Sequence, residues 1–196
     1  MKYVIMAAGE GKRWHNYLGV PKHLVEINGE TLLGRTTRLL KENGIEDYII
    51  TCNDEKYTKY GKIAEQSEKD CEIDRFTRVT EPVCYLYGDV YYTEEAIKTI
   101  IDVWVGDVMF LGSGQEIFAV KVNDFNLFFE HKNRVKELYL RGEIRRCIGW
   151  ELYRSINGIP LDKHWINGRY VYIEDETNDI DYPEDYEEFK KKREKK

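Results

Sequence analysis

Residues 3–24 read YVIMAAGEGKRWHNYLGVPKHL, and this stretch decides the fold of the chain. Its first four residues are apolar and predict one short buried strand. Small residues follow at the expected end of that strand: Ala7, Ala8, Gly9, Gly11 and Gly19. A backbone with few Cβ atoms can turn sharply and bring its N–H groups close to a phosphate. The stretch therefore predicts a strand that runs into a glycine loop.

Three cations lie in the same loop. Lys12 and Arg13 follow the glycines, and Pro21 stiffens the segment that presents Lys22. Together with the glycines they predict a polyphosphate site. The loop is not a dinucleotide fingerprint, because the third glycine of that pattern would fall at Trp14. It is not a Walker loop either, because no Gly-Lys-Ser/Thr follows.

The order of these residues resembles the signature of the MobA-like and sugar-phosphate nucleotidylyltransferase superfamily. The matching residues are Ala7, Ala8, Gly9, Gly11, Arg13, Pro21 and Lys22. In that family the loop wraps the triphosphate of a nucleotide, and the lysine after the proline contacts the reacting phosphates. The resemblance thus implies a nucleotide-binding set of Ala7, Ala8, Gly9, Glu10, Gly11, Lys12, Arg13 and Lys22.

A second motif follows the apolar residues 83–87, which predict another buried strand. Gly88 and Asp89 follow it, so we expect this carboxylate at the carboxyl edge of the sheet, and beside the glycine loop if the two strands are neighbours. In the family the corresponding aspartate binds Mg²⁺, and the resemblance implies Lys22, Arg13 and Asp89 as catalytic residues. The alternative is that Asp89 belongs to a helix start, but the natural cap, Thr93, comes four residues later.

A third motif closes the chain. Asp179 and Asp181 are two residues apart, so an extended backbone places both side chains on one face, towards one cation. Pro183 suits the first turn of a final helix. The resemblance implies that Asp181 is the other Mg²⁺ ligand and that Asp179 assists. Alternatively, these acids only enrich a helix N-terminus, where the helix dipole favours them.

Between these motifs the chain alternates strands and helices. Thr31 is a candidate cap for a helix to about Asn43, and residues 48–52 predict the next strand. Strand, helix, strand is the first half of a parallel, doubly wound unit. The pattern predicts a single-domain α/β fold, and the resemblance implies a three-layer α/β/α, Rossmann-like, mostly parallel (mixed) sheet of the nucleotide-diphospho-sugar transferase type.

The resemblance also divides the chain. It implies a nucleotidyltransferase domain over 1–189, with a nucleotide-binding half over about 1–110 and an acceptor-binding half over about 111–189. The remaining residues, 190–196, form a basic tail. The acceptor half contains four arginines that have two interpretations: they hold an acceptor phosphate, or they lie on an ordinary solvated helix face. These are Arg141, Arg145, Arg146 and Arg154.

Three segments are harder to interpret. Residues 55–68 fit a helix, 76–79 a short strand, and 143–157 a further helix. The family normally reads the nucleotide base from the region that corresponds to 53–80, and its Gly-Ser/Thr dipeptide is missing here. The base therefore stays open.

Composition narrows the function classes. A net charge of −6 argues against a nucleic-acid partner. No apolar run reaches the 18 residues of a membrane helix, and no signal peptide is recognisable, so we expect neither membrane insertion nor secretion. Four cysteines, far apart, are typical of reduced thiols in a cytoplasmic protein. Exposed aromatic side chains would suit a homodimer.

The motifs together favour an Mg²⁺-dependent nucleotidyltransferase. Its partners would be a nucleoside triphosphate and a phosphorylated small-molecule acceptor, either a sugar 1-phosphate or a phospho-alcohol, and it would release pyrophosphate. Two alternatives stay open: a metal-dependent glycosyltransferase of the related nucleotide-sugar fold, and a nucleotide-binding module without turnover. The former usually carries Asp-x-Asp at mid-chain, where this chain has only Gly88-Asp89.

Overall fold

The apolar runs form a seven-stranded sheet. The computed structural model of the chain describes residues 1–9, 11–67 and 70–194. The strands of the sheet lie in the order β10-β8-β9-β6-β1-β4-β5. Their bounds are β1 (Lys2–Met6), β4 (Tyr48–Thr51), β5 (Lys62–Ala64), β6 (Val83–Tyr87), β8 (Val108–Gly112), β9 (Ile117–Val122) and β10 (Tyr170–Tyr172).

Strand β1 occupies the middle of the sheet. It pairs in parallel with β4 on one side and with β6 on the other, and Met6 lies level with Thr51 and Tyr87. The carboxyl ends of three strands therefore meet at one edge, which is where the glycine loop and Asp89 leave the sheet. Strand β9 is antiparallel to both of its neighbours, so the sheet is mixed, as predicted.

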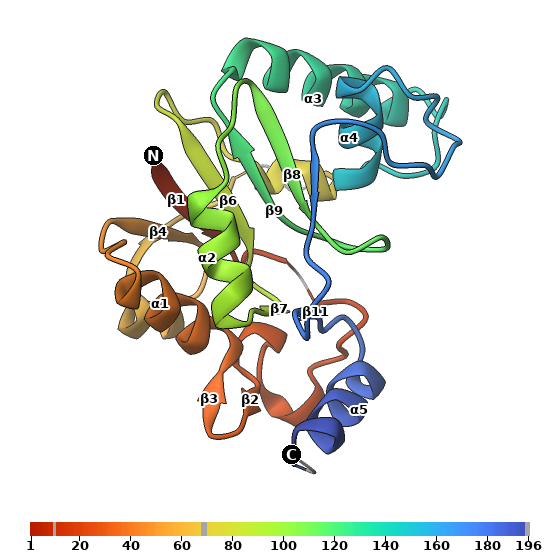
Figure 1. The fold of residues 1–196 in the computed structure, drawn as a ribbon. Helices are drawn as coiled ribbons and strands as arrows, with labels where there is room; N and C mark the ends of the chain where they lie inside the picture. The colour runs from red at the N-terminus through yellow and green to blue at the C-terminus, as the bar shows by residue number, and fades with distance from the viewer. Residues whose placement is uncertain (10, 68–69, 195–196) are drawn as a thin grey trace.

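Among the described residues, four α-helices flank the sheet: α1 (Leu32–Glu42), α2 (Glu94–Asp102), α3 (Phe125–Leu140) and α4 (Gly149–Ile156). A further helix, α5 (Pro183–Glu194), packs beside the glycine loop. The expected caps form. The side chains of Thr31, Thr93 and Asp124 accept hydrogen bonds from the backbone N–H groups that start α1, α2 and α3. In Figure 1 the sheet runs between the pair α1 and α2 and the pair α3 and α4, which gives the expected three-layer α/β fold.

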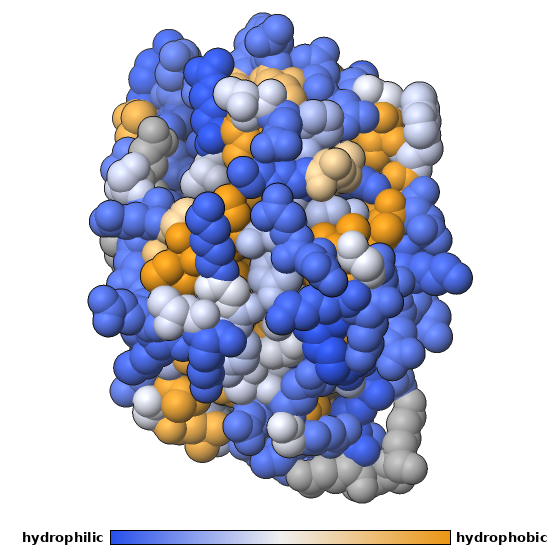
Figure 2. All heavy atoms as spheres, turned by 90° about the vertical axis from the view of Figure 1, so that its left-hand side faces the viewer, coloured by the Kyte–Doolittle hydropathy of each residue, from blue (hydrophilic) through white to orange (hydrophobic). Residues whose placement is uncertain are grey.

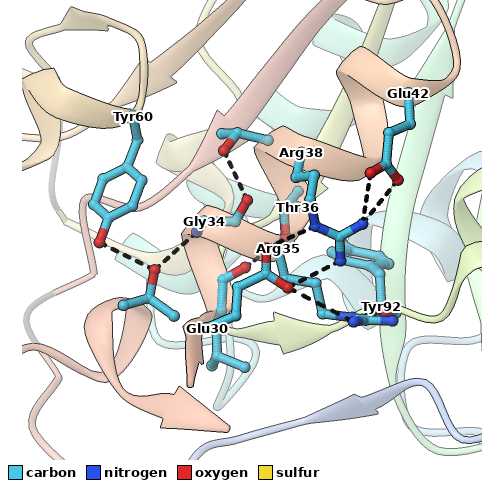
Figure 3. Close-up of polar contacts among 11 residues, drawn as sticks. Glu30, Gly34, Arg35, Thr36, Arg38, Glu42, Tyr60 and Tyr92 are labelled. Carbon is cyan, nitrogen blue, oxygen red and sulfur yellow. Dashed lines mark hydrogen bonds and ion pairs between the residues drawn. The ribbon is translucent and has the colours of Figure 1, made fainter. Parts of the chain in front are cut away.

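Helix α1 is tied to the segment just beyond Asp89. Arg35 Nε donates to the carbonyl of Tyr92 at 2.6 Å, directly after the short strand β7 (Val90–Tyr91). Arg38 bridges Glu30 and Glu42 with hydrogen bonds of 2.8 to 2.9 Å (Figure 3). The Arg35 bond ties α1 to the segment after Asp89, and the Arg38 bonds tie the helix to the short hairpin that precedes it and to its own last turn.

A second, smaller core holds the glycine loop in place. It lies outside the main sheet and joins the loop to the short hairpin β2 (Glu26–Ile27) and β3 (Glu30–Thr31), to α1 and to α5. Its buried members are Trp14, Val25, Ile27, Leu32, Tyr91, Ile180 and Tyr186. The indole N–H of Trp14 also donates to the carbonyl of Val20 at 2.8 Å. Trp14 is therefore a packing residue that anchors the loop.

Three predicted elements are wrong in part. Residues 55–68 contain no α-helix in their described part, but a 3₁₀ helix η3 (Glu55–Tyr60) followed by strand β5. Residues 76–79 form no strand, because Phe76 turns into the core beside Tyr85 and a second 3₁₀ helix, η4 (Glu72–Arg75), precedes it. Helix α4 starts only at Gly149. In all three cases tertiary packing overrides a weak local pattern.

The surface carries several exposed aromatic side chains, including Trp104 and Trp165. Figure 2 shows that apolar side chains on one face lie in separate small groups among polar ones. The expected homodimer stays a prediction. None of the helices in the described ranges has the length and apolar character needed to cross a bilayer.

Candidate functional site

Charged side chains from three distant parts of the sequence meet at the carboxyl edge of the sheet. Lys22 Nζ lies 2.7 Å from Asp181 Oδ1 and also forms an ion pair with Asp89. Arg13 forms an ion pair with the other oxygen of Asp181. Lys22 and Asp89 are buried, so this contact is shielded from water. The structure thus brings together the three motifs that the sequence singles out.

Gly88 allows Asp89 to reach this position. A Cβ atom at Gly88 would lie 2.8 Å from the carbonyl oxygen of Met6 and 3.2 Å from Cβ of Ala7. The N–H of Gly88 donates to that same carbonyl at 3.0 Å. Only a glycine lets the chain pass so close to the start of the glycine loop. Asp89 therefore turns towards the loop directly after β6.

The final acidic motif arrives through a short strand pair. Strand β11 (Asn178–Asp179) runs antiparallel to β7, with Asp179 level with Val90. The N–H of Ile180 donates to the carbonyl of Asp89 at 3.1 Å. This pairing carries both Asp179 and Asp181 to Asp89. We call Asp89, Asp179 and Asp181 the carboxylate cluster.

The carboxylate cluster has the geometry of a cation site. One oxygen from each of its residues lies within 4.8 Å of the other two. Oδ1 of Asp179 is buried and has no hydrogen-bond partner among the described residues. A buried acceptor without a partner is costly, and a bound cation would satisfy it.

Electrostatics set the charges in the cluster. Burial alone would lower the pKa of Lys22, but the surrounding carboxylates raise it above its ordinary value. Burial alone would raise the pKa of Asp89, but the ammonium of Lys22 lowers it well below its usual range. Burial, together with the charges of Asp89 and Asp181, raises the pKa of Asp179 well above its ordinary value. These shifts favour an ammonium at Lys22, a carboxylate at Asp89 and the protonated form of Asp179.

Two cavities meet at this cluster. The smaller has a volume of about 270 Å³ and is lined by the glycine loop on one side. The larger has a volume of about 430 Å³ and is lined mainly by the second half of the chain. Arg13, Glu72, Arg75 and Asp181 line both cavities. The two cavities therefore adjoin each other beside Asp181 of the carboxylate cluster.

Most of the predicted loop residues line the smaller cavity: Ala8, Gly9, Gly11, Lys12, Arg13 and Lys22. Ala7 is buried at the end of β1 and does not line it. Glu10 lies outside the described residues. The role of each residue in binding a nucleotide stays a prediction, although the loop has the expected position.

The four arginines of the second half divide into two pairs. Arg146 and Arg154 line the larger cavity, and both donate to Oε1 of Glu151, at 3.1 and 3.0 Å. Arg141 pairs with Glu143 at the surface, and Arg145 is exposed. Two of the four candidates therefore face a ligand-sized space, beside the aromatic rings of Trp150 and Trp165.

The sequence alone did not reveal three further residues that line the larger cavity: Glu72, Arg75 and Glu116. Glu72 and Arg75 lie in η4, in the polar region that resisted interpretation. Burial and the nearby charge of Asp181 raise the pKa of Glu116 to about 7. No spacing or motif marks these residues, because their position depends on how η4 and the β8–β9 connection pack.

The fold and the site together define an α/β domain of the nucleotide-diphospho-sugar transferase type. Comparison with known proteins agrees with this class. Residues 3–82 match the sequence model of the MobA-like NTP transferase domain, so the expected resemblance to that superfamily is confirmed.

One curated relative matches a short region of the chain. The chain is 40% identical over 70 residues to the "Bifunctional IPC transferase and DIPP synthase" of Thermococcus kodakarensis. The alignment covers 36% of this chain and 16% of that protein, so the chain matches about a sixth of the length of this relative.

Solved structures match over nearly the whole chain. The inositol-1-phosphate CTP transferase from T. maritima superposes with a TM-score of 0.59 at 13% identity, over 98% of this chain and 96% of that one. The CTP:phosphocholine cytidylyltransferase from Streptococcus pneumoniae gives 0.61 at 16% identity, over 97% of each. A nucleotidyl transferase from Methanothermobacter thermautotrophicus superposes with a TM-score of 0.62 at 14% identity, over 99% of this chain and 97% of that one. At these identities the likeness establishes the fold.

Proposed function

We propose that this chain is a nucleotidyltransferase. It transfers a nucleoside monophosphate from a nucleoside triphosphate to a phosphorylated acceptor and releases pyrophosphate. One observation carries the proposal: Lys22 and the carboxylate cluster lie where a cavity lined by the glycine loop meets a second cavity of ligand size. Two anionic substrates that react with each other need such a junction.

The chemistry requires positioning and charge neutralisation more than acid–base catalysis. An oxygen of the acceptor phosphate forms a bond to the α-phosphorus, and the bond between that phosphorus and the bridging oxygen to the β-phosphate breaks. The electron pair leaves with pyrophosphate. Because the attacking oxygen is already anionic, no general base is needed.

Cationic side chains and backbone N–H groups of the chain serve this reaction. Lys22 shifts its ammonium from the carboxylates towards the α-phosphate and stabilises the charge that develops there. Arg13, Lys12 and the N–H groups of the glycine loop bind the pyrophosphate as it leaves. These are the groups that line the smaller cavity.

Mg²⁺ is the cation that suits the carboxylate cluster. The residues fit it, since they offer three hard oxygen ligands and include the buried, unpartnered Oδ1 of Asp179. Asp89, Asp179 and Asp181 would hold it, and it would neutralise phosphate charge where the two substrates meet. With such a cation in place, the side chains of Lys22 and Arg13 would be released from their ion pairs with this cluster and could bind the phosphates.

The acceptor belongs to the second half of the chain in this proposal. Two of the proteins of similar fold are named for CTP, one with inositol 1-phosphate and one with phosphocholine. We therefore propose CTP as the first nucleotide to test and these two phosphate esters, with glucose 1-phosphate, as the first acceptors.

Pyrophosphate release tests the proposal. Each of the four nucleoside triphosphates is incubated with Mg²⁺ and each acceptor, and a wild-type reaction that needs one nucleotide and one acceptor is the expected result. Asp89→Asn is the matched inactive control. Nucleotide binding without pyrophosphate release across the panel would favour a silent binding module, and transfer from a nucleotide sugar without pyrophosphate release would favour a glycosyltransferase.

A further inference from the structure

The guanidinium of Arg75 lies at the boundary between the two cavities. It lines both of them, and it lies against Gly9 of the glycine loop. A Cβ atom placed on Gly9 would be 3.0 Å from Nη2 and 3.3 Å from Cζ of Arg75. The absence of a side chain at Gly9 therefore leaves room for this arginine as well as for a ligand.

The backbone of Arg75 is anchored by the packing of its neighbour in the sequence. The next residue, Phe76, is fully buried, and its ring packs edge-on against Tyr85 and Phe128 at centroid distances of 5.2 and 5.4 Å. Burial alone would lower the pKa of Arg75, but Glu72, Asp89 and Asp181 raise it. The side chain is a cation on an anchored backbone.

Four arginines line the larger cavity, and Arg75 differs from the other three. Arg13 pairs with Asp181, while Arg146 and Arg154 both pair with Glu151. Within the described part of the chain, no hydrogen bond or ion pair is found for the guanidinium of Arg75. Its N–H donors are therefore available on the wall that the two cavities share.

We propose that Arg75 binds the phosphate of the acceptor and holds it beside the carboxylate cluster. A guanidinium can grip two phosphate oxygens at once, which fixes both position and orientation. The glycine loop already supplies Lys12, Arg13 and backbone N–H groups for the triphosphate. Glu72 and Glu116 line the larger cavity, and Glu72 also lines the smaller one, so a phosphate beside these acidic residues needs an unpaired cation. The assignment to the acceptor rests on the proposed function.

A binding experiment tests Arg75 without turnover. Inorganic phosphate is titrated calorimetrically into the wild type, Arg75→Gln and Arg75→Lys in the presence of Mg²⁺. Arg78→Gln is the matched control, because Arg78 is exposed and lies over the ring of Phe129. We expect Arg75→Gln to weaken phosphate binding at least about tenfold, Arg75→Lys to weaken it less because it keeps the charge, and Arg78→Gln to bind like the wild type.

Kinetics separate the acceptor from the nucleotide. Arg75→Gln should lower kcat/KM for the acceptor by about 10²-fold, while the Kd for the nucleotide changes less than about threefold. Wild-type affinity for phosphate in Arg75→Gln, or a loss confined to the nucleotide, would overturn the assignment. A wild type that binds phosphate through Arg75 but releases no pyrophosphate would instead count against the proposed function. Melting curves of Arg75→Lys and Arg75→Gln exclude unfolding as the cause.

Discussion

Replacing Lys22 by alanine removes the only buried cation that contacts two members of the carboxylate cluster among the described residues. In the wild type, Asp89 and Asp181 are balanced by Lys22 and Arg13. Without Lys22, Asp89 keeps its burial, at 4% exposure, but loses its ion-pair partner. Breaking a buried pair from one side typically costs about 3 to 5 kcal/mol, because the remaining charge stays desolvated. Asp181 is less buried, so we expect the lower end, about 3 kcal/mol.

Urea unfolding measures this loss. The free energy of unfolding is determined for the wild type, Lys22→Ala and the control Lys56→Ala, whose exposed side chain pairs loosely with Asp54 at 3.7 Å. The control should lose less than about 0.5 kcal/mol. Excess Mg²⁺ should restore part of the stability of Lys22→Ala, because a divalent cation also neutralises the cluster. Turnover should stay at least about 10²-fold below the wild type, since the α-phosphate loses its ammonium.

A free energy of unfolding of Lys22→Ala that lies within about 1 kcal/mol of the wild-type value, measured without Mg²⁺, would refute this reasoning. It would mean that water or a protonated carboxyl group compensates for the lost ammonium.

Three further variants test other parts of the site. Asp179→Asn should abolish the rise in melting temperature that Mg²⁺ causes in the wild type; an undiminished rise in thermal melts would exclude Asp179 as a ligand. Gly88→Ala should cost about 1 to 3 kcal/mol in urea unfolding and reduce turnover, because the new Cβ meets the carbonyl of Met6; a neutral effect would contradict the close approach. Burial lowers the pKa of His23 from 6.5 to about 4, so the unfolded chain binds the proton first. Neutral His23 therefore contributes its full stability above about pH 6.5, and about 3 kcal/mol of the free energy of unfolding is lost as the pH falls towards 4. In His23→Gln, the midpoint of urea unfolding should change less with pH over this range.

Much of the fold was predictable because its signals are local. A short apolar run followed by small residues specifies β1 and the glycine loop, and the side chains of Thr31 and Asp124 reach N–H groups only three residues away. The order of strands and helices then limits the topology to few choices. The three motifs that meet at the carboxyl edge of the sheet were likewise visible in the sequence, because phosphate and cation chemistry favours glycine, lysine and aspartate; which of these residues bind a substrate or a metal stays a prediction.

The region of residues 53–80 was not predictable, because its structure depends on distant partners. Phe76 packs against rings from β6 and α3 and does not form the expected strand. This packing places Arg75 at the junction of the two cavities. A polar segment with one aromatic residue carries no periodicity that reports such a position. The same holds for Glu116, whose pKa depends on carboxylates contributed by other elements.

Outside residues 53–80, the sequence by itself determined the main strands and helices, their order and the three motifs of the site. Tertiary structure alone decided which side chains touch. Lys22 and Asp181 are 159 residues apart, and their contact exists only because β11 pairs with β7 and because Gly88 lets the chain pass Met6. Local patterns report what each residue can do within a few neighbours, whereas distances between motifs follow from strand pairing and packing across the whole chain.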